Sequence, residues 1–441
     1  MIAMHDHQAS SPRRAKPRTF RRPARGTLMT GVAVCALGSS LLTACGTSSG
    51  SGSGPVTVNF YNFPDPSGAV QQAANNCSNS RYKIIYNKLQ SAADQQRLQM
   101  ARRLAAHDPS MDILGLDVTW EAEFATAGWI LPWTGRFRQE AMAGTLAGPL
   151  KTATWRGKLV AVPYNSNTQL LWYRSDLVPH PPTTWAQMIA DAQALARQGK
   201  PHLIEIQGAQ YEGVVVWFNT LVASAGGSIL NPASTQAQSG PPALKALSIM
   251  KQLASSPAAD PSLGVQMEDQ NRLAMEAGTA AFELNYPYVY PSMKADNPKL
   301  FKVFKWAPYP RVSAGQPARV TIGGIDLAVS AYSPHPQLAF QAALCLRNAA
   351  NQLTAAVKGG LPPTLASVYN NPQMQSAYPF RHLILQQVND GSVRPQTPLY
   401  QVVSAAISHQ VSPPSSINPA STAQNLRTQI NNALQGKGLT P

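Results

Sequence analysis

Strand-like and helical segments alternate along the chain after residue 55. The strand-like segments are short and apolar and lie at residues 56–62, 81–86 and 111–116. Between the last two, residues 94–106 repeat apolar side chains at helical spacing. This alternation predicts an α/β fold with a mostly parallel sheet, and ligands of such sheets bind just beyond the carboxyl ends of the strands.

The length of the chain indicates two lobes. About 390 residues follow residue 54, which is more than one hydrophobic core usually holds. The strand at 159–163 is predicted to lead out of the first lobe, and 320–329, with Gly323 and Gly324 in its middle, to return to it. We therefore expect lobe one at residues 55–163 and 320–368, and lobe two at residues 164–319, with C-terminal helices at 369–441 mostly in lobe two.

The first residues indicate secretion. Residues 1–44 begin with seven basic side chains against one acid and continue as an uncharged apolar run that ends at Cys45. A basic start, an apolar run and small residues before the cleavage point are typical of a signal peptide. The sequence Leu-Thr-Ala-Cys at the end of this run resembles the lipobox of bacterial lipoproteins, which implies that Cys45 is acylated and becomes the first residue after cleavage. Two or more acyl chains hold a protein at a membrane. The alternative is an uncleaved signal anchor. The Gly/Ser-rich residues 45–54 are predicted to be a flexible tether.

The charge of the chain does not indicate a nucleic-acid partner. The formal net charge is +15, but the signal segment carries seven basic and one acidic side chain, so the remainder bears about +9. No run of Lys and Arg interleaved with aromatic residues follows Gly54. A mildly basic, solvated surface is the interpretation that fits, and no nucleic acid is expected to bind.

Two of the four cysteines remain once Cys35 leaves with the signal and Cys45 takes lipid. In an oxidising compartment, Cys77 and Cys345 are candidates for one disulfide. The alternative is two separate buried thiols, which behave as small apolar side chains.

Catalytic signatures are missing from the chain after residue 54. It has no G-x-S-x-G, no G-x-x-x-x-G-K-[ST] and no H-E-x-x-H, and its histidines do not pair at metal-ligand spacing. We therefore expect no cofactor, no metal and no enzymatic activity. The enzymatic alternative is a glycosidase that uses Asp117 and Glu268 as paired carboxylates.

Several polar and aromatic residues near predicted strand ends suit a sugar. Sugars present hydroxyl groups around apolar ring faces, so their sites combine carboxylates, amides and aromatic rings. The residues with this chemistry are Asp117, Asn167, Glu268, Tyr286 and Arg394. Each also has a structural interpretation, such as a helix cap for Asp117, a turn for Asn167 or an exposed loop for Arg394.

Stretches in order along the chain resemble the extracellular sugar-binding proteins of bacterial ABC importers, of the maltose-binding type. Within that family the chain is most similar to the LpqY-type trehalose-binding lipoproteins of actinobacteria. The stretches that carry the resemblance are QQRLQMARRLA (95–105), LGLDVTWEAEFATAGWILP (114–132), NTQLLWYRSDLV (167–178), EGVVVWFNTLVASAGGSIL (212–230), ELNYPYVYPSM (283–293), APYPRVSAGQPARVTIGGIDLAV (307–329) and VRPQTPLYQ (393–401).

The resemblance implies a two-lobed type II periplasmic-binding-protein fold. Each lobe has a mixed sheet flanked by helices, crossover strands join the lobes, and a sugar binds between them. Carried over at matching positions, the ligand-binding residues are Asp117, Asn167, Glu268, Tyr286, Gln96, Gly324, Arg394 and Asn62.

Further expectations follow from the same resemblance. The family usually has a tryptophan where this chain has Tyr286, and it has cysteines that match Cys77 and Cys345. It also implies a monomer that takes a disaccharide, trehalose above all, and delivers it to membrane permease subunits driven by a cytoplasmic ATPase.

Overall fold

The computed structural model describes residues 54–91 and 93–437. The predicted signal segment, the acylation site at Cys45 and most of the Gly/Ser tether lie outside the described residues. No helix within 54–91 and 93–437 is both long and apolar enough to cross a membrane.

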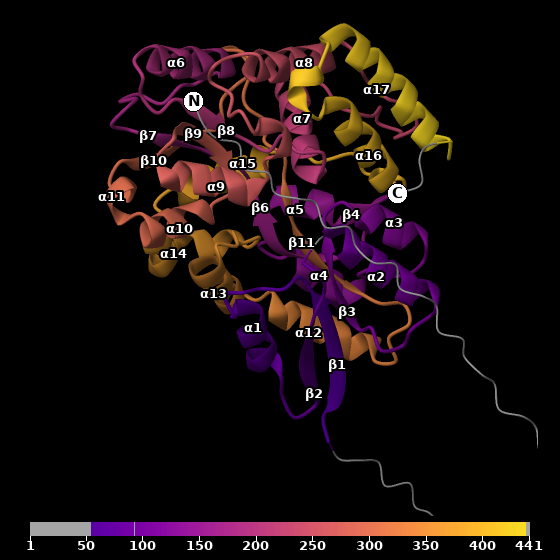
Figure 1. Cartoon of the computed structure of the whole chain (residues 1–441). Helices are drawn as coiled ribbons and strands as arrows, with labels where there is room; N and C mark the ends of the chain where they lie inside the picture. The colour runs from indigo at the N-terminus through magenta and orange to yellow at the C-terminus, as the bar shows by residue number, and fades with distance from the viewer. Residues whose placement is uncertain (1–53, 92, 438–441) are drawn as a thin grey trace, which may run out of the picture. The chain divides into compact units, whose positions relative to one another are not determined.

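Two sheets form the framework of the described residues (Figure 1). The first has the strand order β2-β1-β3-β11-β6 and the second the order β10-β7-β9-β8. The strands of the first sheet are β1 (Val56–Asn62), β2 (Tyr82–Lys88), β3 (Ile113–Asp117), β6 (Val162–Asn167) and β11 (Gly323–Val329). Those of the second are β7 (Leu170–Arg174), β8 (Leu203–Glu205), β9 (Ala280–Asn285) and β10 (Phe304–Ala307), and a separate ribbon joins β4 (Thr154–Trp155) to β5 (Lys158–Leu159).

Helices flank both sheets. Those around the first sheet are α1 (Ala69–Cys77), α2 (Ala93–Ala105), α3 (Glu121–Thr126), α4 (Gly135–Met142), α5 (Ala147–Thr152), α12 (Pro336–Leu346) and α13 (Ala349–Gly359). Those around the second are α6 (Trp185–Arg197), α7 (Glu212–Ser224), α8 (Pro241–Ala254), α9 (Glu268–Ala277), α10 (Val289–Asp296), α11 (Pro298–Phe301), α14 (Pro372–Ala377), α15 (Arg381–Asp390), α16 (Tyr400–Val411) and α17 (Pro419–Leu434). We call the two assemblies lobe one and lobe two.

The sheets are mixed, which corrects the expectation of a mostly parallel sheet. β1 pairs in parallel with β2 and β3, but β11 runs antiparallel to both β3 and β6. In lobe two only the β8–β9 pair is parallel. The reason is that β6 and β11 are crossover strands, so their direction follows the route between lobes and not a local β-α-β unit.

The returning strand also differs from its prediction at the glycines. β11 begins at Gly323, so Gly323 and Gly324 start the strand and do not occupy its middle. Gly324 has φ of 140°, and a Cβ atom there would lie 2.2 Å from the carbonyl oxygen of Asn165. This position therefore requires glycine on both conformational and steric grounds.

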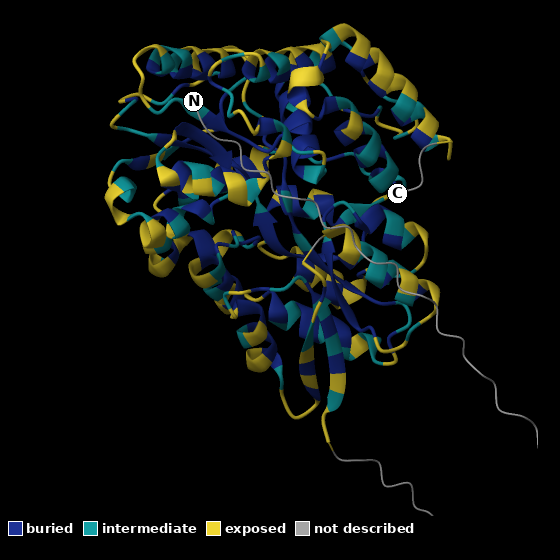
Figure 2. Cartoon of the chain, in the orientation of Figure 1, coloured by how far each residue is buried: buried dark blue, intermediate teal, exposed yellow. Residues whose placement is uncertain are grey.

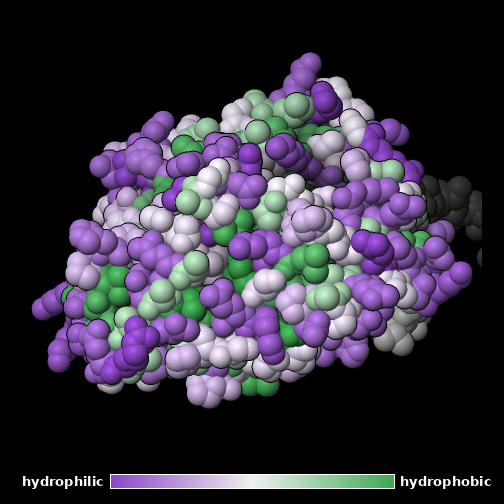
Figure 3. Space-filling view, turned by 90° about the horizontal axis from the view of Figure 1, so that it is seen from above, coloured by the Kyte–Doolittle hydropathy of each residue, from purple (hydrophilic) through white to green (hydrophobic). Residues whose placement is uncertain are grey.

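Separate hydrophobic cores support the two lobes, and buried residues line the sheets in Figure 2. Lobe one packs β1, β3 and α12 around residues such as Phe60 and Phe340. Lobe two packs α6, α7 and α8 on one face of its sheet, around Trp185 and Trp217, while Trp172 and Phe304 stack on the other face. Figure 3 shows the molecule from above, and on this face hydrophobic residues lie in small groups among hydrophilic ones.

The neighbouring strands β8 and β9 bury two carboxyl groups in the lobe-two sheet. Glu205 pairs with Glu283 in the strand register, and both are fully buried. Burial raises the pKa of each to about 8; the Asp260 carboxylate adds to the effect at Glu205, and the Asn285 amide opposes it at Glu283. Both groups therefore bind protons more tightly in the folded chain than in the unfolded chain.

We expect the protein to become less stable as the pH rises from about 4.5 to about 8, and this loss to level off above that range. The sign follows because the folded state holds protons that the unfolded state releases across this window. Glu283→Gln, which cannot ionise, is expected to flatten the fall of the melting temperature measured between pH 5 and pH 8.5. Glu140 is exposed, so Glu140→Gln should leave the dependence of the melting temperature on pH unchanged. The same dependence in Glu283→Gln as in the parent would show that Glu283 does not cause it.

Candidate functional site

Arg394 joins the two lobes. It lies in the loop between α15 and α16, and its side chain is only 4% exposed. Its Nη1 donates to Glu212 Oε1 at 2.6 Å, and its Nη2 lies 3.4 Å from Asp117 Oδ1. Glu212 opens α7 of lobe two, whereas Asp117 ends β3 of lobe one. One buried guanidinium thus contacts carboxylates from both halves of the protein.

Lobe two holds Glu212 in position for this contact. The hydroxyl groups of Tyr400 and Ser404, both on α16, donate to the Glu212 carboxylate. Although burial disfavours its charged form, the carboxylates of Asp117 and Glu212 keep the pKa of Arg394 well above its usual value. The arginine is therefore a permanent cation at this position.

Asp117 presents a partly exposed carboxylate beside the arginine. Its side chain is 28% exposed, and its Oδ1 accepts from the backbone N–H and the hydroxyl of Thr119 at 3.0 and 2.8 Å. Among the described residues, the hydrogen bonds of the Asp117 side chain all use Oδ1. The geometry therefore leaves Oδ2 as an acceptor for a hydroxyl group.

The crossover strands bring Asn167 to the same place. Asn167 ends β6 and pairs with Gly323 of β11. A Cβ atom at Gly323 would lie 3.6 Å from the Asn167 Cβ and 3.9 Å from Arg394 Nη2. Asn167, Gly323 and Arg394 therefore converge, and glycine keeps the space between them open.

Glu268 and Tyr286 form the second part of the site, from lobe two. Glu268 is the first residue of α9, and Tyr286 directly follows β9. The side chain of Asn285 connects them, because its Nδ2 donates to the Glu268 carbonyl oxygen at 2.9 Å and its Oδ1 accepts from the Tyr286 N–H at 2.8 Å. A hollow of about 410 Å³ opens beside this pair, lined by Glu268 and Tyr288 among others.

Burial and neighbouring charges shift the pKa of both members of this pair. Burial raises the pKa of Glu268, and the Tyr211 hydroxyl partly offsets the effect. Burial also raises the pKa of Tyr286; the Glu268 carboxylate adds to the rise, and the Arg394 cation opposes it. Tyr286 therefore lies within electrostatic range of both Glu268 and Arg394.

Two predicted ligand residues are not joined to this cluster by the contacts of the described residues. Gln96 is buried and its Nε2 donates to the carbonyl oxygens of Gln90 and Ser91, so its amide supports its own loop. Asn62 is fully buried beside Gly115, where an added Cβ would lie 2.0 Å from Asn62 Oδ1. Their role as ligands stays a prediction.

The chemistry of the cluster suits an uncharged, hydroxyl-rich molecule. Asp117 and Glu268 accept hydrogen bonds, Arg394 and the Asn167 amide donate them, and Tyr286 offers a ring face. Within the part of the chain that the structure describes, no group of three or more His, Cys, Asp or Glu is arranged to hold a metal ion.

Sequence reasoning did not identify Glu212 and Tyr400 as part of the site. Both lie in stretches that carry the family resemblance, but neither stands at a predicted strand end. Only the fold brings them to Arg394, across 182 and 6 positions of sequence respectively. The sequence held one signal for such a partner, the charge of Arg394, because an arginine that becomes buried requires a carboxylate nearby.

Comparison with known proteins gives matches over more than half of the chain. The family model described as bacterial extracellular solute-binding protein matches residues 82–353. A Deinococcus radiodurans protein described as a probable ABC transporter-binding protein is 29% identical over 329 residues, which cover 70% of this chain and 76% of the relative.

Solved structures agree on the architecture. The maltose-bound MalE3 of T. maritima is 25% identical, with a TM-score of 0.75, and the match covers 85% of this chain and 99% of that one. The sugar-binding protein MalE of Xanthomonas citri is 20% identical, with a TM-score of 0.75 and coverage of 87% and 98%, and it supports the fold alone. The predicted two-lobed fold with mixed sheets is confirmed.

Proposed function

Because this chain belongs to the bacterial extracellular solute-binding proteins of ABC transporters, we propose that it captures trehalose or a closely related disaccharide between its lobes. The observation that carries the proposal is the contact of Arg394 with Asp117 of lobe one and Glu212 of lobe two. A sugar held at this point bonds to side chains of both lobes. The maltose described in a 25% identical neighbour supports a disaccharide of this size.

Binding proceeds with closure of the lobes. A neutral disaccharide gains affinity from many hydrogen bonds, of which those to Asp117, Glu268 and Arg394 are charge-assisted and therefore the strongest. The Tyr286 ring covers an apolar sugar face, with less area than a tryptophan and with an added hydroxyl. The closed form then docks, as a monomer, on permease subunits that a cytoplasmic ATPase drives.

We expect the Asp117→Ala and Glu268→Ala variants to bind trehalose at least about tenfold more weakly, the scale of one lost charge-assisted hydrogen bond. Calorimetry on residues 46–441 measures the affinity, against a panel of trehalose, maltose, an amino sugar and a glycerophosphodiester. The exposed Glu140→Ala is the matched control and should bind normally. Normal affinity in both site variants would overturn the site, whereas tighter binding of another panel member would replace the cargo.

The protein is anchored to the extracytoplasmic face of the membrane through acylated Cys45. We expect Cys45→Ala to move the protein from the membrane fraction to the soluble fraction, because the acyl chains supply the membrane affinity. Immunoblots of separated fractions measure this. Retention in the membrane would instead indicate an uncleaved signal anchor.

A further inference from the structure

We propose that lobe two carries a second binding site, for a small molecule with an apolar body and a single anionic group. The site is a hollow of about 510 Å³, larger than the hollow beside Glu268. It lies between the segment before α6, the loop that joins β10 to β11, and α15. Its volume falls within the range of small-molecule sites.

Much of the wall of the hollow is apolar and conformationally restricted. Pro181, Pro182, Pro308 and Pro317 line it together with Leu383. Proline has a fixed backbone angle and no N–H donor, so these walls keep their shape and offer few hydrogen bonds. They suit the apolar body of a ligand better than the hydroxyl groups of a sugar.

Two arginines supply the charge. Arg311 donates from Nη1 to the Ala314 carbonyl oxygen at 2.8 Å, and Arg319 donates from Nη1 to the Asp390 carbonyl oxygen at 3.0 Å. These bonds orient the guanidinium groups, yet neither arginine forms an ion pair with a carboxylate of the described residues.

The remaining donors favour one anion. A guanidinium has five N–H donors in a planar fork that matches a carboxylate or sulfonate, and the bonds above use only part of them. The Asp390 carboxylate also lines the hollow, so its charged side chains sum to +1. This balance favours a singly charged ligand over a phosphate or a dianion.

The hollow is separate from the proposed sugar site. Its lining belongs to lobe two alone and does not include Asp117, Glu268 or Arg394. A ligand can therefore bind there while the sugar site is occupied, and this second site does not depend on which cargo the sugar site takes.

The test uses the fluorescence of 1-anilinonaphthalene-8-sulfonate, a monoanion with an apolar body, titrated onto the protein from residue 46. Arg311→Gln with Arg319→Gln is expected to weaken its binding by at least about tenfold, because the charge-assisted bonds are lost while both positions stay polar. Lys245→Gln with Lys299→Gln removes the same net charge from exposed positions and should bind the dye as the parent does. N-phenyl-1-naphthylamine, which lacks the sulfonate, should bind the parent at least about tenfold more weakly.

Equal dye affinity in the parent and the double-arginine variant would overturn the proposal. Equal affinity of the neutral and anionic dyes, or loss of dye binding in Asp117→Ala, would also overturn it. Displacement of the dye by dodecanoate but not by naphthalene-2-carboxylate would assign the site to lipid-derived acids, and the reverse would assign it to aromatic acids. Failure of both to displace it would exclude carboxylates and overturn the proposal as well.

Discussion

Replacing Arg394 by methionine is expected to weaken trehalose binding by about a hundredfold and to lower the melting temperature. The affinity falls because the cation that reaches both lobes is lost, and a hydrogen bond to a charged group is worth about 1.5–3 kcal/mol. Stability falls because Glu212 loses its ion-pair partner, and breaking a buried pair costs about 3–5 kcal/mol. Because about a third of the Glu212 side chain is exposed, water solvates part of the unpaired carboxylate. We therefore expect a loss of stability near the lower end of that range. Calorimetry and thermal denaturation measure the two effects.

The double variant Arg394→Met with Glu212→Met separates the two roles of the arginine. In the double variant the carboxylate of Glu212 no longer remains without its cation, and the partly exposed Asp117 is left to water, so the double variant should regain part of the stability that Arg394→Met loses. It should not regain sugar affinity, because the donor is still absent. Wild-type affinity in Arg394→Met would show that the guanidinium only holds the loop in place and does not bind the cargo.

Local structure was predictable where a short pattern determines it. Threonine is a common N-cap residue, and the side chain of Thr184 accepts from the Gln187 N–H at the start of α6. Glycine is common just after the end of a helix, and α7 ends at Ser224, two residues before Gly226. In both places the capping chemistry lies within a few residues of the helix end, so the sequence contains all the information.

The electrostatic partners of the site were not predictable from local pattern. Asp117 and Arg394 were identified by residue type and position near strand ends, but their contact spans 277 positions. Glu212 had no distinguishing signal, since an acid at the start of a helix is usually a solvated charge. The family resemblance supplied what pattern analysis lacks, namely which loops meet between the lobes.

The direction of the strands shows a second limit. Alternating strands and helices correctly indicated an α/β fold, yet β11 runs antiparallel to its neighbours. The direction of a strand depends on the path of the chain before it, and the chain enters β11 from lobe two. Apolar periodicity records burial and not direction, so the mixed character of the sheets followed only from the resemblance.

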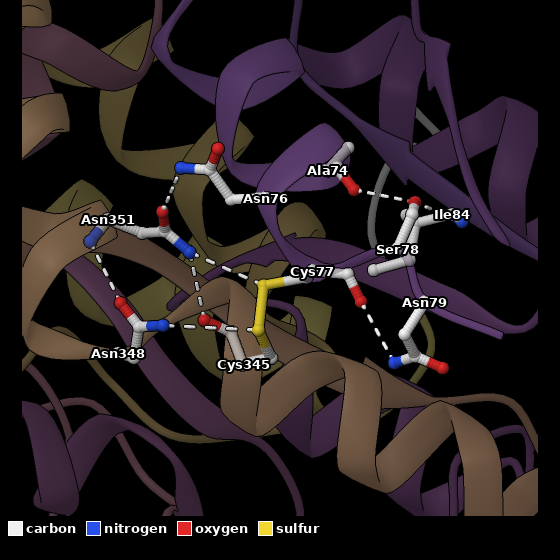
Figure 4. Close-up of a disulfide and its surroundings, with 9 residues drawn as sticks. All are labelled: Ala74, Asn76, Cys77, Ser78, Asn79, Ile84, Cys345, Asn348 and Asn351. Carbon is white, nitrogen blue, oxygen red and sulfur yellow. Dashed lines mark hydrogen bonds between the residues drawn. A yellow bond between two sulfur atoms is a disulfide. The ribbon is translucent and has the colours of Figure 1, made fainter. Parts of the chain in front are cut away.

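The double variant Cys77→Ser with Cys345→Ser is expected to lose about 2–5 kcal/mol of free energy of unfolding. The structure joins these cysteines in a disulfide between α1 and α12, and Asn351 bonds to the Cys77 sulfur and the Cys345 carbonyl oxygen (Figure 4). The bond spans 268 positions, which include all of β6 to β11. Removing a cross-link that closes so long a loop raises the conformational entropy of the unfolded chain more than that of the folded one. We therefore expect a loss toward the upper end of the range. Urea denaturation measures it.

Reduction of the parent protein supplies the matched control for this variant. Dithiothreitol should move the urea midpoint of the parent to that of the double variant and leave the variant itself unchanged. Sugar affinity should stay close to that of the parent in both, because both helices flank the lobe-one sheet and neither carries a residue of the cluster around Arg394. A parent midpoint that does not respond to reductant would mean that the cross-link contributes no stability, and lobe one would then depend on its apolar core alone.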